Sequence, residues 1–395
     1  MRAVAVALVT FATFVDVVAY SIAVPVLPDL SRRLGASPTI IGLLFASFGV
    51  TLLTVSMPMG AVSDRVGRKG PIVGGLVALA AASLLFAFAD GLPLLFVARL
   101  VQGGADAVTW VVGFALIADL YGAQERGRVS GIIMSGTSFA FMIGPTLGGW
   151  LYELGGVRLP FIAVAVMAIV SALSFLLVRT PTSMAPRERV PVRAVITEPA
   201  VAACAAAVVT AAATISMLEP VLALQLAGMD IGPARIGMLF GVAAVATTVL
   251  HPLYGRLSDR WGARRLTLIG LIAGACVLPV TARAWSYDSA VGFYLLQMAA
   301  IALVITPSLA YMAEAVSETG IGSFGVAYGL YNMAWGAGLL GGPAIGGFLF
   351  ERIGFARLAL WWAPAIVLVT LALARVRSGA DKLPAEQADD MEACS

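Results

Sequence analysis

Three acidic residues lie well inside long apolar runs of this sequence: Asp16, Asp106 and Glu219. A charged side chain in the middle of a bilayer costs roughly 2.5–3.5 kcal/mol on insertion scales, and it usually marks an ion pathway or a proton relay. Because removal from water disfavours the ionised form, such an acid can hold a proton near neutral pH. Asp16, near the middle of the first apolar run, could bind either a proton or a cationic amine, so that binding one displaces the other.

Asp106 shares a predicted helical face with polar and aromatic partners. Arg99, Gln102 and Trp110 stand at helical steps of three, four and seven along the same run. One interpretation is a second protonation site beside an aromatic wall for cations. The alternative is an internal polar network in which Arg99 neutralises Asp106 or Asp16. We interpret Arg99 as a structural or relay residue, since its positive charge would repel a cationic substrate.

Glu219 immediately precedes Pro220 in the outer half of a predicted membrane span. Proline loosens a helix and could create a hinge or gate there. The glutamate itself is a candidate for an ion pathway or proton relay, as an acid inside a span. A carboxylate that extends toward the outer surface is the alternative interpretation.

Aromatic and amide side chains gather late in the sequence and could form the wall of a cation site. They are Tyr328, Tyr331, Asn332 and Trp335. Simple helix packing is the competing explanation. Tyr20 follows Asp16 by four residues and could hydrogen-bond it, or it could serve packing alone.

The composition is typical of an integral membrane protein and predicts an all-α fold. The chain has 395 residues, of which 60% are hydrophobic and only 12% charged, against about a quarter charged in soluble domains. The net charge of +3 is spread along the chain, which argues against nucleic acid as a partner. We find no nucleophile–base set, phosphate loop or metal-ligand spacing, so we expect no enzymatic activity, cofactor or metal. His251, beside Pro252, is interpreted as structural.

Twelve apolar segments are long enough to span a bilayer. They are 4–27, 39–61, 70–89, 92–118, 128–151, 158–178, 197–224, 234–254, 265–284, 290–314, 323–350 and 356–375. If both termini are cytoplasmic, the inner loops hold 17 lysines and arginines and the outer loops hold 7, with Arg99 inside a span. The positive-inside rule therefore favours cytoplasmic termini.

The two halves of the chain repeat each other. "GAVSDRVGRKG" at 60–70 returns as "GRLSDRWGARR" at 255–265, an offset of 195; "GPTLGG" at 144–149 returns as "GPAIGG" at 342–347, an offset of 198. We predict an N-terminal six-helix half, a cytoplasmic linker, a C-terminal six-helix half and a disordered acidic tail, with boundaries at 1–178, 179–196, 197–375 and 376–395. Parallel repeats of this kind place a binding site between the halves and rock around it.

The first repeated stretch resembles the loop signature of the major facilitator superfamily. The residues that carry it are Gly60, Asp64, Arg65, Gly67, Arg68 and Lys69, with Asp259 in the second copy. Glycines permit a tight turn, and Asp64 could lie near a helix N-terminus, where the dipole favours an anion. Asp119 and Arg126, at neighbouring helix ends, are candidate partners for this loop. A merely solvated basic turn is the alternative.

The second repeated stretch is similar to the glycine–proline motif of the drug/proton antiporter branch. It comprises Gly131, Ala140, Gly144, Pro145, Gly148 and Gly149, with Gly342 and Pro343 as the second copy. Small residues allow close helix packing, and the proline breaks one helical hydrogen bond. An alanine stands at position 140, where that motif usually has glycine. A generic packing seam is the alternative.

Further stretches resemble a bacterial-type relative of the vesicular monoamine and acetylcholine transporters. They are Asp16 with Pro25 and Pro28, "GLLFAS" at 42–47, Arg99-x-x-Gln102-Gly103, "ERG" at 125–127 and "MLEP" at 217–220. The resemblance implies that Glu219 binds a substrate amine or acts as a gate. The chain departs from that family at Phe48 and Asn332, which replace a lysine–aspartate pair, and at Ala302, which replaces an acid.

The leading hypothesis is a proton-coupled antiporter that exports organic cations, amines or several drugs by alternating access. A symporter or uniporter for a small metabolite is the first alternative, and Arg99 could then bind an anion. A membrane sensor that does not transport is the second alternative. We expect a monomer in a lipid bilayer, in a bacterial plasma membrane.

Overall fold

The computed structural model describes residues 2–177, 195, 197–317 and 324–376, and within these ranges every regular element is a helix. The predicted tail lies outside them except for residue 376, and the predicted linker except for residue 195. Eleven of the described segments are long and apolar enough to cross a membrane. These findings confirm the predicted all-α membrane fold.

The helices follow the predicted spans closely. The N-terminal group is α1 (Arg2–Ser21), η1 (Val24–Val26), α2 (Leu27–Leu34), α3 (Pro38–Val66), α4 (Lys69–Ala87), α5 (Leu92–Leu120), α6 (Ala123–Gly155) and α7 (Arg158–Leu177). The C-terminal group is α9 (Pro199–Ala227), α10 (Pro233–Trp261), α11 (Ala263–Thr281), α12 (Tyr287–Ser317) and α13 (Phe324–Ala374). Gly354 breaks α13 with a φ of 75°, so α13 contains both of the last two predicted spans.

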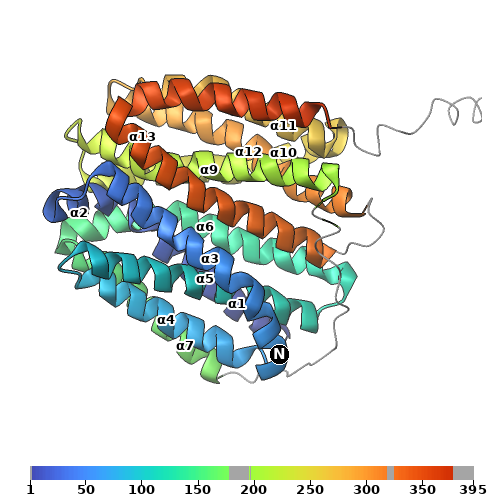
Figure 1. Cartoon of the computed structure of the whole chain (residues 1–395). Coiled ribbons are helices and arrows are strands. Elements are labelled where there is room, and N and C mark those ends of the chain that lie inside the picture. The colour runs from blue at the N-terminus through green and yellow to red at the C-terminus, as the bar shows by residue number, and fades with distance from the viewer. Residues whose placement is uncertain (1, 178–194, 196, 318–323, 377–395) are drawn as a thin grey trace, which may run out of the picture.

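Short connections make consecutive long helices run back and forth between two ends of the molecule (Figure 1). We refer to the end at which α1 begins as the linker end, and to the opposite end, where α2 lies, as the α2 end. The helices from α1 to α7 form one group and those from α9 to α13 the other. We refer to these groups as the two halves.

Glycine and proline set the ends of two equivalent helices, α3 and α10. Each helix begins with a proline, Pro38 or Pro233, whose missing N–H needs no partner in a first helical turn. Each ends at a glycine with a φ of 86°, Gly67 or Gly262, a conformation that side chains rarely adopt. The tight turn predicted for the repeated loop is therefore present twice.

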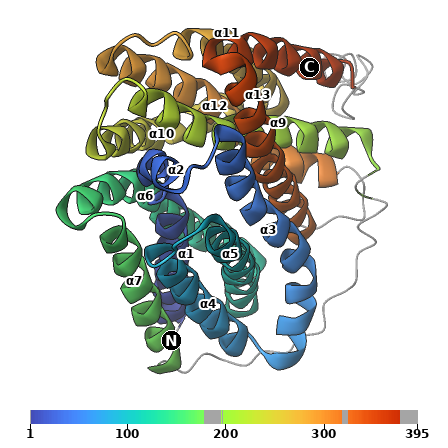
Figure 2. The same cartoon turned by 60° about the vertical axis from the view of Figure 1, so that its left-hand side comes forward.

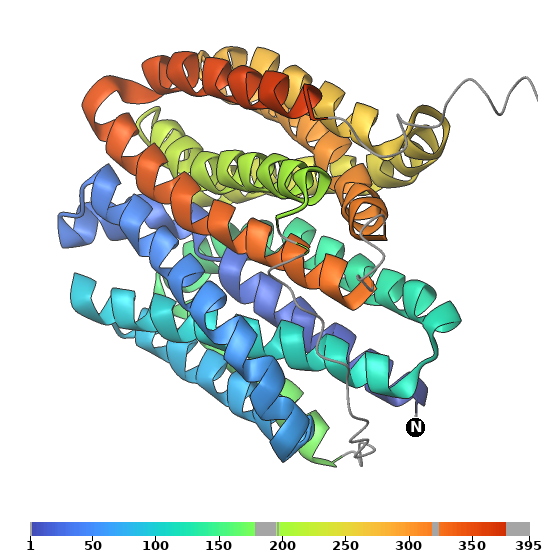
Figure 3. The ribbon, with the colours of Figure 1, turned by 45° about the vertical axis from the view of Figure 1, so that its right-hand side comes forward.

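The halves meet along two seams, in which α3 packs on α13 and α6 packs on α10 (Figures 2 and 3). A Cβ atom on Gly42 would lie 2.2 Å from the carbonyl oxygen of Pro343, and one on Gly237 would lie 2.2 Å from that of Pro145. Only glycine allows the backbones to approach so closely. These glycines are 195 residues apart and the prolines 198 apart, so the two seams follow the sequence repeat.

Candidate functional site

The three acids predicted to lie inside the membrane are all buried and come from three different helices. Asp16 on α1 is 1% exposed, Asp106 on α5 is 9% exposed and Glu219 on α9 is 8% exposed. The first two belong to the N-terminal half and the third to the C-terminal half. The candidate residues thus come from both halves, and the Tyr20–Glu219 hydrogen bond joins the two halves at this point.

Asp16 and Asp106 form an acid pair. The indole Nε1 of Trp110 donates a hydrogen bond of 3.1 Å to Oδ2 of Asp16. The two carboxyl groups are close enough to interact electrostatically. With both groups ionised, Oδ1 of Asp16 has no hydrogen-bond donor among the described residues, whereas a proton on either group would let the two carboxyls hydrogen-bond each other. Two carboxylates that share a buried site cannot both ionise cheaply, so the acid pair is suited to holding a proton or a cation.

The sequence suggested that Tyr20 could bond Asp16 on its own helix. In the structure, the Tyr20 side chain instead contacts the other half. Its hydroxyl donates a hydrogen bond of 2.8 Å to Oε2 of Glu219. The sequence left open a bond to Asp16 or packing alone. Neither alternative anticipated this contact, because the four-residue spacing describes only α1 and a tyrosine hydroxyl extends beyond its own helix. The burial of Glu219 also contradicts the alternative in which this carboxylate extends to the surface.

Arg99 is fully buried and lies on the Glu219 side of the site. Its Nη1 donates to Oε1 of Gln102 at 2.8 Å, and its guanidinium lies over the ring of Phe45, 4.0 Å from the centroid. It interacts electrostatically with Tyr20 and Glu219. Within the described part of the chain no ion pair joins Arg99 to either aspartate, and its Nε and Nη2 atoms have no hydrogen-bond partner.

Apolar side chains from both halves cover the Tyr20–Glu219 contact. Phe48 packs on the Tyr20 ring with centroids 5.1 Å apart, and the cluster also contains Leu52 of α3 and Leu339 and Trp335 of α13. Phe45 and Phe48 were not predicted as site residues, although the "GLLFAS" stretch that contains Phe45 and precedes Phe48 was a signal. Tyr294, which interacts electrostatically with Glu219, left no such signal.

The aromatic group predicted late in the sequence separates in the structure. Trp335 reaches the site cluster and stacks on Tyr331, with centroids 6.5 Å apart. The Tyr331 hydroxyl instead accepts a hydrogen bond of 3.3 Å from Ser308, within the C-terminal half. Asn332 is half-buried, and the side chain of Tyr328 lies outside the described residues.

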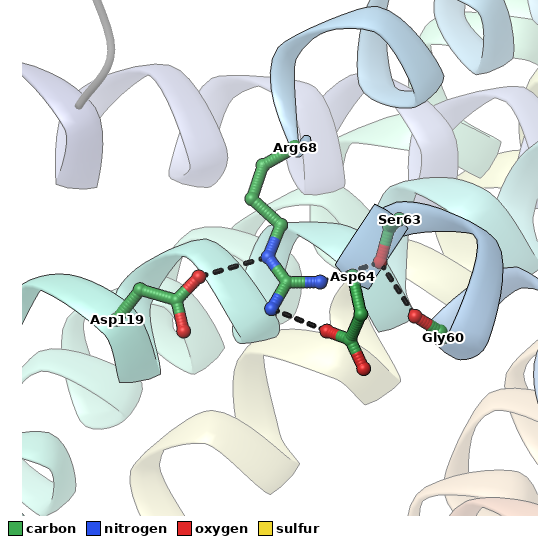
Figure 4. A network of polar contacts seen from close by, with 5 residues as sticks. All are labelled: Gly60, Ser63, Asp64, Arg68 and Asp119. Atoms are coloured by element: carbon green, nitrogen blue, oxygen red, sulfur yellow. Dashed lines mark hydrogen bonds and ion pairs between the residues drawn. The ribbon is translucent and has the colours of Figure 1, made fainter. Parts of the chain in front are cut away.

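The first repeated loop forms a network at the linker end (Figure 4). Arg68 contacts Asp64 at 2.6 Å and Asp119 at 2.8 Å, and its Nη1 donates to Ser63, whose hydroxyl donates to the carbonyl of Gly60. Burial lowers the pKa of Arg68, but the hydrogen bonds with Asp119 and Asp64 outweigh it and raise this pKa above its ordinary value. The predicted partner Asp119 is confirmed.

The burial of Arg68 also contradicts the alternative of a solvated turn at its position, whereas Arg65 is exposed. The side chain of Arg126 lies outside the described residues.

The second repeated loop keeps only part of this arrangement. Ala263 stands at the position equivalent to Arg68, and Asp259 is exposed. The equivalent of Lys69 is Arg264, and both bind the end of the last helix of their own half. Lys69 donates to the carbonyl of Leu176 at 2.9 Å, and Arg264 donates to those of Leu373, Ala374 and Val376.

The glycine–proline motif on α6 packs against two neighbours at once. Cβ atoms on Gly144 and Gly148 would collide with Ser21 and Ile22 at the end of α1, and one on Gly149 would lie 2.4 Å from the carbonyl of Pro233 on α10. Gly342 likewise approaches α9, where a Cβ atom would lie 2.2 Å from the carbonyl of Ala213. A Cβ on Gly131 would meet nothing within 4 Å, so close packing does not extend to that residue.

A cavity of about 800 Å³ lies between α1 and α6 toward the linker end. Phe11, Phe14 and Phe139 stack along it, with centroids 6.4 and 6.0 Å apart. The side chains of Glu125 and Arg128 also line it. The cavity has the size and apolar lining of small-molecule sites, but Phe14 stands two residues from Asp16 and so projects from a different face of α1.

Comparisons with known proteins agree with this architecture. The family model described as Major Facilitator Superfamily matches residues 9–230 and 201–390. The human vesicular acetylcholine transporter is 31% identical over 355 residues, which cover 86% of this chain and 65% of the relative. The human synaptic vesicular amine transporter is 27% identical over 325 residues, 80% of this chain and 62% of the relative. The chain thus spans just under two thirds of these relatives' length.

Solved structures share the fold at low sequence identity. A bacterial homologue of the human lysosomal transporter Spinster, in an inward-facing and occupied conformation, matches with a TM-score of 0.78 and 15% identity, over 94% of this chain and 96% of that one. At this identity the likeness concerns the fold alone.

Proposed function

Since the chain belongs to the Major Facilitator Superfamily, we propose that it is a secondary transporter that exchanges protons for small organic cations, amines or drugs by alternating access. The acid pair is the observation that carries this proposal. Two carboxyl groups interact in a buried site, and among the described residues one oxygen of Asp16 has no donor partner unless one of the two groups carries a proton. A proton or a cationic group would stabilise this arrangement, and the two would compete for it.

The Tyr20–Glu219 contact supplies a second acceptor for a cation, in the other half of the protein. A bound ammonium could replace the tyrosine hydroxyl on the Glu219 carboxylate, while the rings of Phe48 and Trp335 lie nearby. Aromatic faces attract cations through their quadrupole. The names of the amine- and acetylcholine-transporting relatives support this class of substrate.

We place the linker end in the cytoplasm and the protein in a plasma membrane, as the distribution of lysine and arginine favours. The lumen of a vesicle is topologically equivalent to the cell exterior, so the relatives' vesicular location is compatible with this orientation. The energy source is a proton gradient. We propose a monomer, without enzymatic activity or cofactor, because each chain contains both halves of the site.

The test uses purified protein in proteoliposomes with an imposed pH gradient. Ethidium and acetylcholine are the probes, and a pH dye reports proton movement. We expect cation movement coupled to proton movement in the opposite direction. Asp16→Asn should abolish the pH-driven component, and undiminished exchange by this variant would remove Asp16 from the mechanism.

The environment of Arg99 favours one alternative, a symporter that carries a small anion or metabolite. Its Nε and Nη2 donors are buried without partners among the described residues, and an anion could bind them. The sign of coupling separates the two functions, because an inward proton gradient drives efflux by an antiporter and uptake by a symporter. A sensor would bind the probe and show no flux.

A further inference from the structure

Two exposed glutamates bridge the halves at the α2 end. Oε2 of Glu351 accepts a hydrogen bond of 2.9 Å from the backbone N–H of Thr39, at the start of α3. Oε1 of Glu153 accepts one of 3.3 Å from the backbone N–H of Ala234, at the start of α10. In each case a carboxylate from the end of a helix in one half binds the beginning of a helix in the other half.

Each contact is electrostatically favourable for the same reason. The first N–H groups of a helix have no partner within the helix, and the helix dipole places partial positive charge there. Thr39 and Ala234 each follow the proline that begins the helix. Their N–H groups are therefore the first free donors of α3 and α10, and a carboxylate is the ligand that such donors prefer.

The two contacts are equivalent under the internal repeat of the chain. Glu153 and Glu351 are 198 residues apart, and Thr39 and Ala234 are 195 apart. These are the same offsets as those of the glycine–proline motif and the basic loop. Each glutamate stands nine residues after the first glycine of its motif, in "GPTLGGWLYE" and "GPAIGGFLFE".

We propose that Glu153 and Glu351 form a symmetric pair of latches that holds the α2 end closed, and that both must release before the site can open at that end. The proposal rests on the alternating access proposed above. The close approaches of Gly42 to Pro343 and of Gly237 to Pro145 bring the backbones of the two halves together near the latches. The glutamates add a charge-dependent contact between the same pairs of helices. Because both side chains are exposed, each contact is weak and can open in every transport cycle.

An arginine stands beside each latch. Arg235 follows Ala234, and its guanidinium lies 5.6 Å from the centroid of the Tyr287 ring. Arg352 follows Glu351 and lies over the Phe348 ring, 4.3 Å from its centroid. The arginine is thereby held on its own helix, whereas the glutamate crosses to α3. Glutamine at position 351 therefore removes the negative charge from the contact between the halves and leaves the arginine in place, although its amide oxygen can still accept the hydrogen bond.

The experiment measures the separation of the halves at both ends by electron–electron double resonance. Spin labels are attached at Leu154→Cys and Trp285→Cys for the α2 end, and at Val66→Cys and Trp261→Cys for the linker end, after Cys204, Cys276 and Cys394 are changed to serine. All four label sites are exposed. The measurements are made on substrate-free protein in lipid nanodiscs.

We expect the double variant Glu153→Gln/Glu351→Gln to lengthen the distance at the α2 end and shorten the one at the linker end. The ratio of molecules open at the α2 end to those closed there should rise roughly 3- to 30-fold, because two charge–dipole contacts are lost. Each single variant should shift the ratio in the same direction by a smaller factor. Glu198→Gln is the matched control, since Glu198 is exposed and caps α9 without a side-chain hydrogen bond.

Distances unchanged in the double variant would overturn the proposal, as would an equal shift in the Glu198→Gln control. The single variants keep the test valid if the double variant does not fold. The distance measurement needs no transported cation. It can therefore support the latch proposal even if the proteoliposome assay contradicts proton–cation exchange, and the assay can support exchange even if the distances contradict the latches.

Discussion

The hydroxyl of Tyr20 lies 2.8 Å from Oε2 of Glu219 and donates a hydrogen bond to it, which joins the first helix of one half to the first helix of the other. Both side chains are buried, so this contact cannot be replaced by water without opening the molecule. It lies one helical turn along α1 from the acid pair.

Tyr20→Phe should impair transport more than it impairs folding. The change leaves the buried Glu219 carboxyl without its donor, which costs roughly 1–3 kcal/mol, and it removes the polar contact between the halves. If this cost falls on the transport cycle, we expect cation transport into proteoliposomes to fall roughly 5- to 150-fold, at 1.36 kcal/mol for each factor of ten. Tyr331→Phe is the control, because it removes a hydroxyl that binds Ser308 within one half only. Equal transport by both variants would contradict this role of Tyr20.

Asp106→Asn should change the number of protons moved for each cation. An amide at this position cannot titrate, so the acid pair would retain only the Asp16 carboxyl. We expect coupled transport to persist at a lower proton-to-cation ratio, whereas Asp16→Asn should abolish it. The ratio is measured by recording the pH dye and ethidium fluxes in the same vesicles. Asp90→Asn, at an exposed loop position, is the control and should leave the proton-to-cation ratio unchanged. If the ratio is also unchanged in Asp106→Asn, Asp106 takes no part in proton coupling.

Much of the fold could be predicted from the sequence because membrane-spanning helices can be recognised by the length and apolarity of their segments. The spans follow from such local patterns. The partnership of Arg68 with Asp119, 51 residues away, was expected because both stand at helix ends on the same side of the membrane. The close approach of Gly42 to Pro343 could not be predicted in the same way, since it depends on how two distant segments pack.

The burial of the three candidate acids could be predicted from the sequence, but the side chains that contact them could not. A carboxylate in an apolar run is conspicuous in a sequence, and Asp16, Asp106 and Glu219 are all buried as expected. The contact of Tyr20 with Glu219 was not among the two alternatives considered, a bond to Asp16 or packing, because helical spacing describes one helix at a time. Phe45 and Phe48 resemble any other apolar residue until the position of Arg99 and Tyr20 is known.

Arg68→Lys should destabilise the linker end of the N-terminal half. A single ammonium cannot contact Asp64, Asp119 and Ser63 together as the planar guanidinium does, so we expect a loss of roughly 1–3 kcal/mol in stability. Thermal unfolding of the purified protein is the measurement. Arg65→Lys, at an exposed neighbouring position, is the control and should melt like the wild type.

The same variant should become more sensitive to alkaline pH. Because the folded-state pKa of Arg68 is raised, its contribution is fully present below the unfolded-state pKa and is lost only as pH rises through the higher folded value. Lysine titrates near pH 10.4, about two units or more below arginine. The difference in melting temperature between wild type and Arg68→Lys should therefore grow between pH 7 and about 10.5, and a constant difference would contradict an ionic role.

Alanine in place of Gly237 or Gly42 should force the two halves apart at the α2 end. In each case the new Cβ would lie 2.2 Å from a backbone carbonyl oxygen of the opposite half, and backbone cannot move aside as a flexible side chain can. We expect transport to be lost and the α2 end to open in the spin-label measurement.

Gly131→Ala is the matched control, since a Cβ there meets nothing within 4 Å and alanine favours a helix by up to about 1 kcal/mol over glycine. This control should keep transport and melt no lower than the wild type. Normal transport by Gly237→Ala would show that the seam between α6 and α10 does not need to close during the cycle.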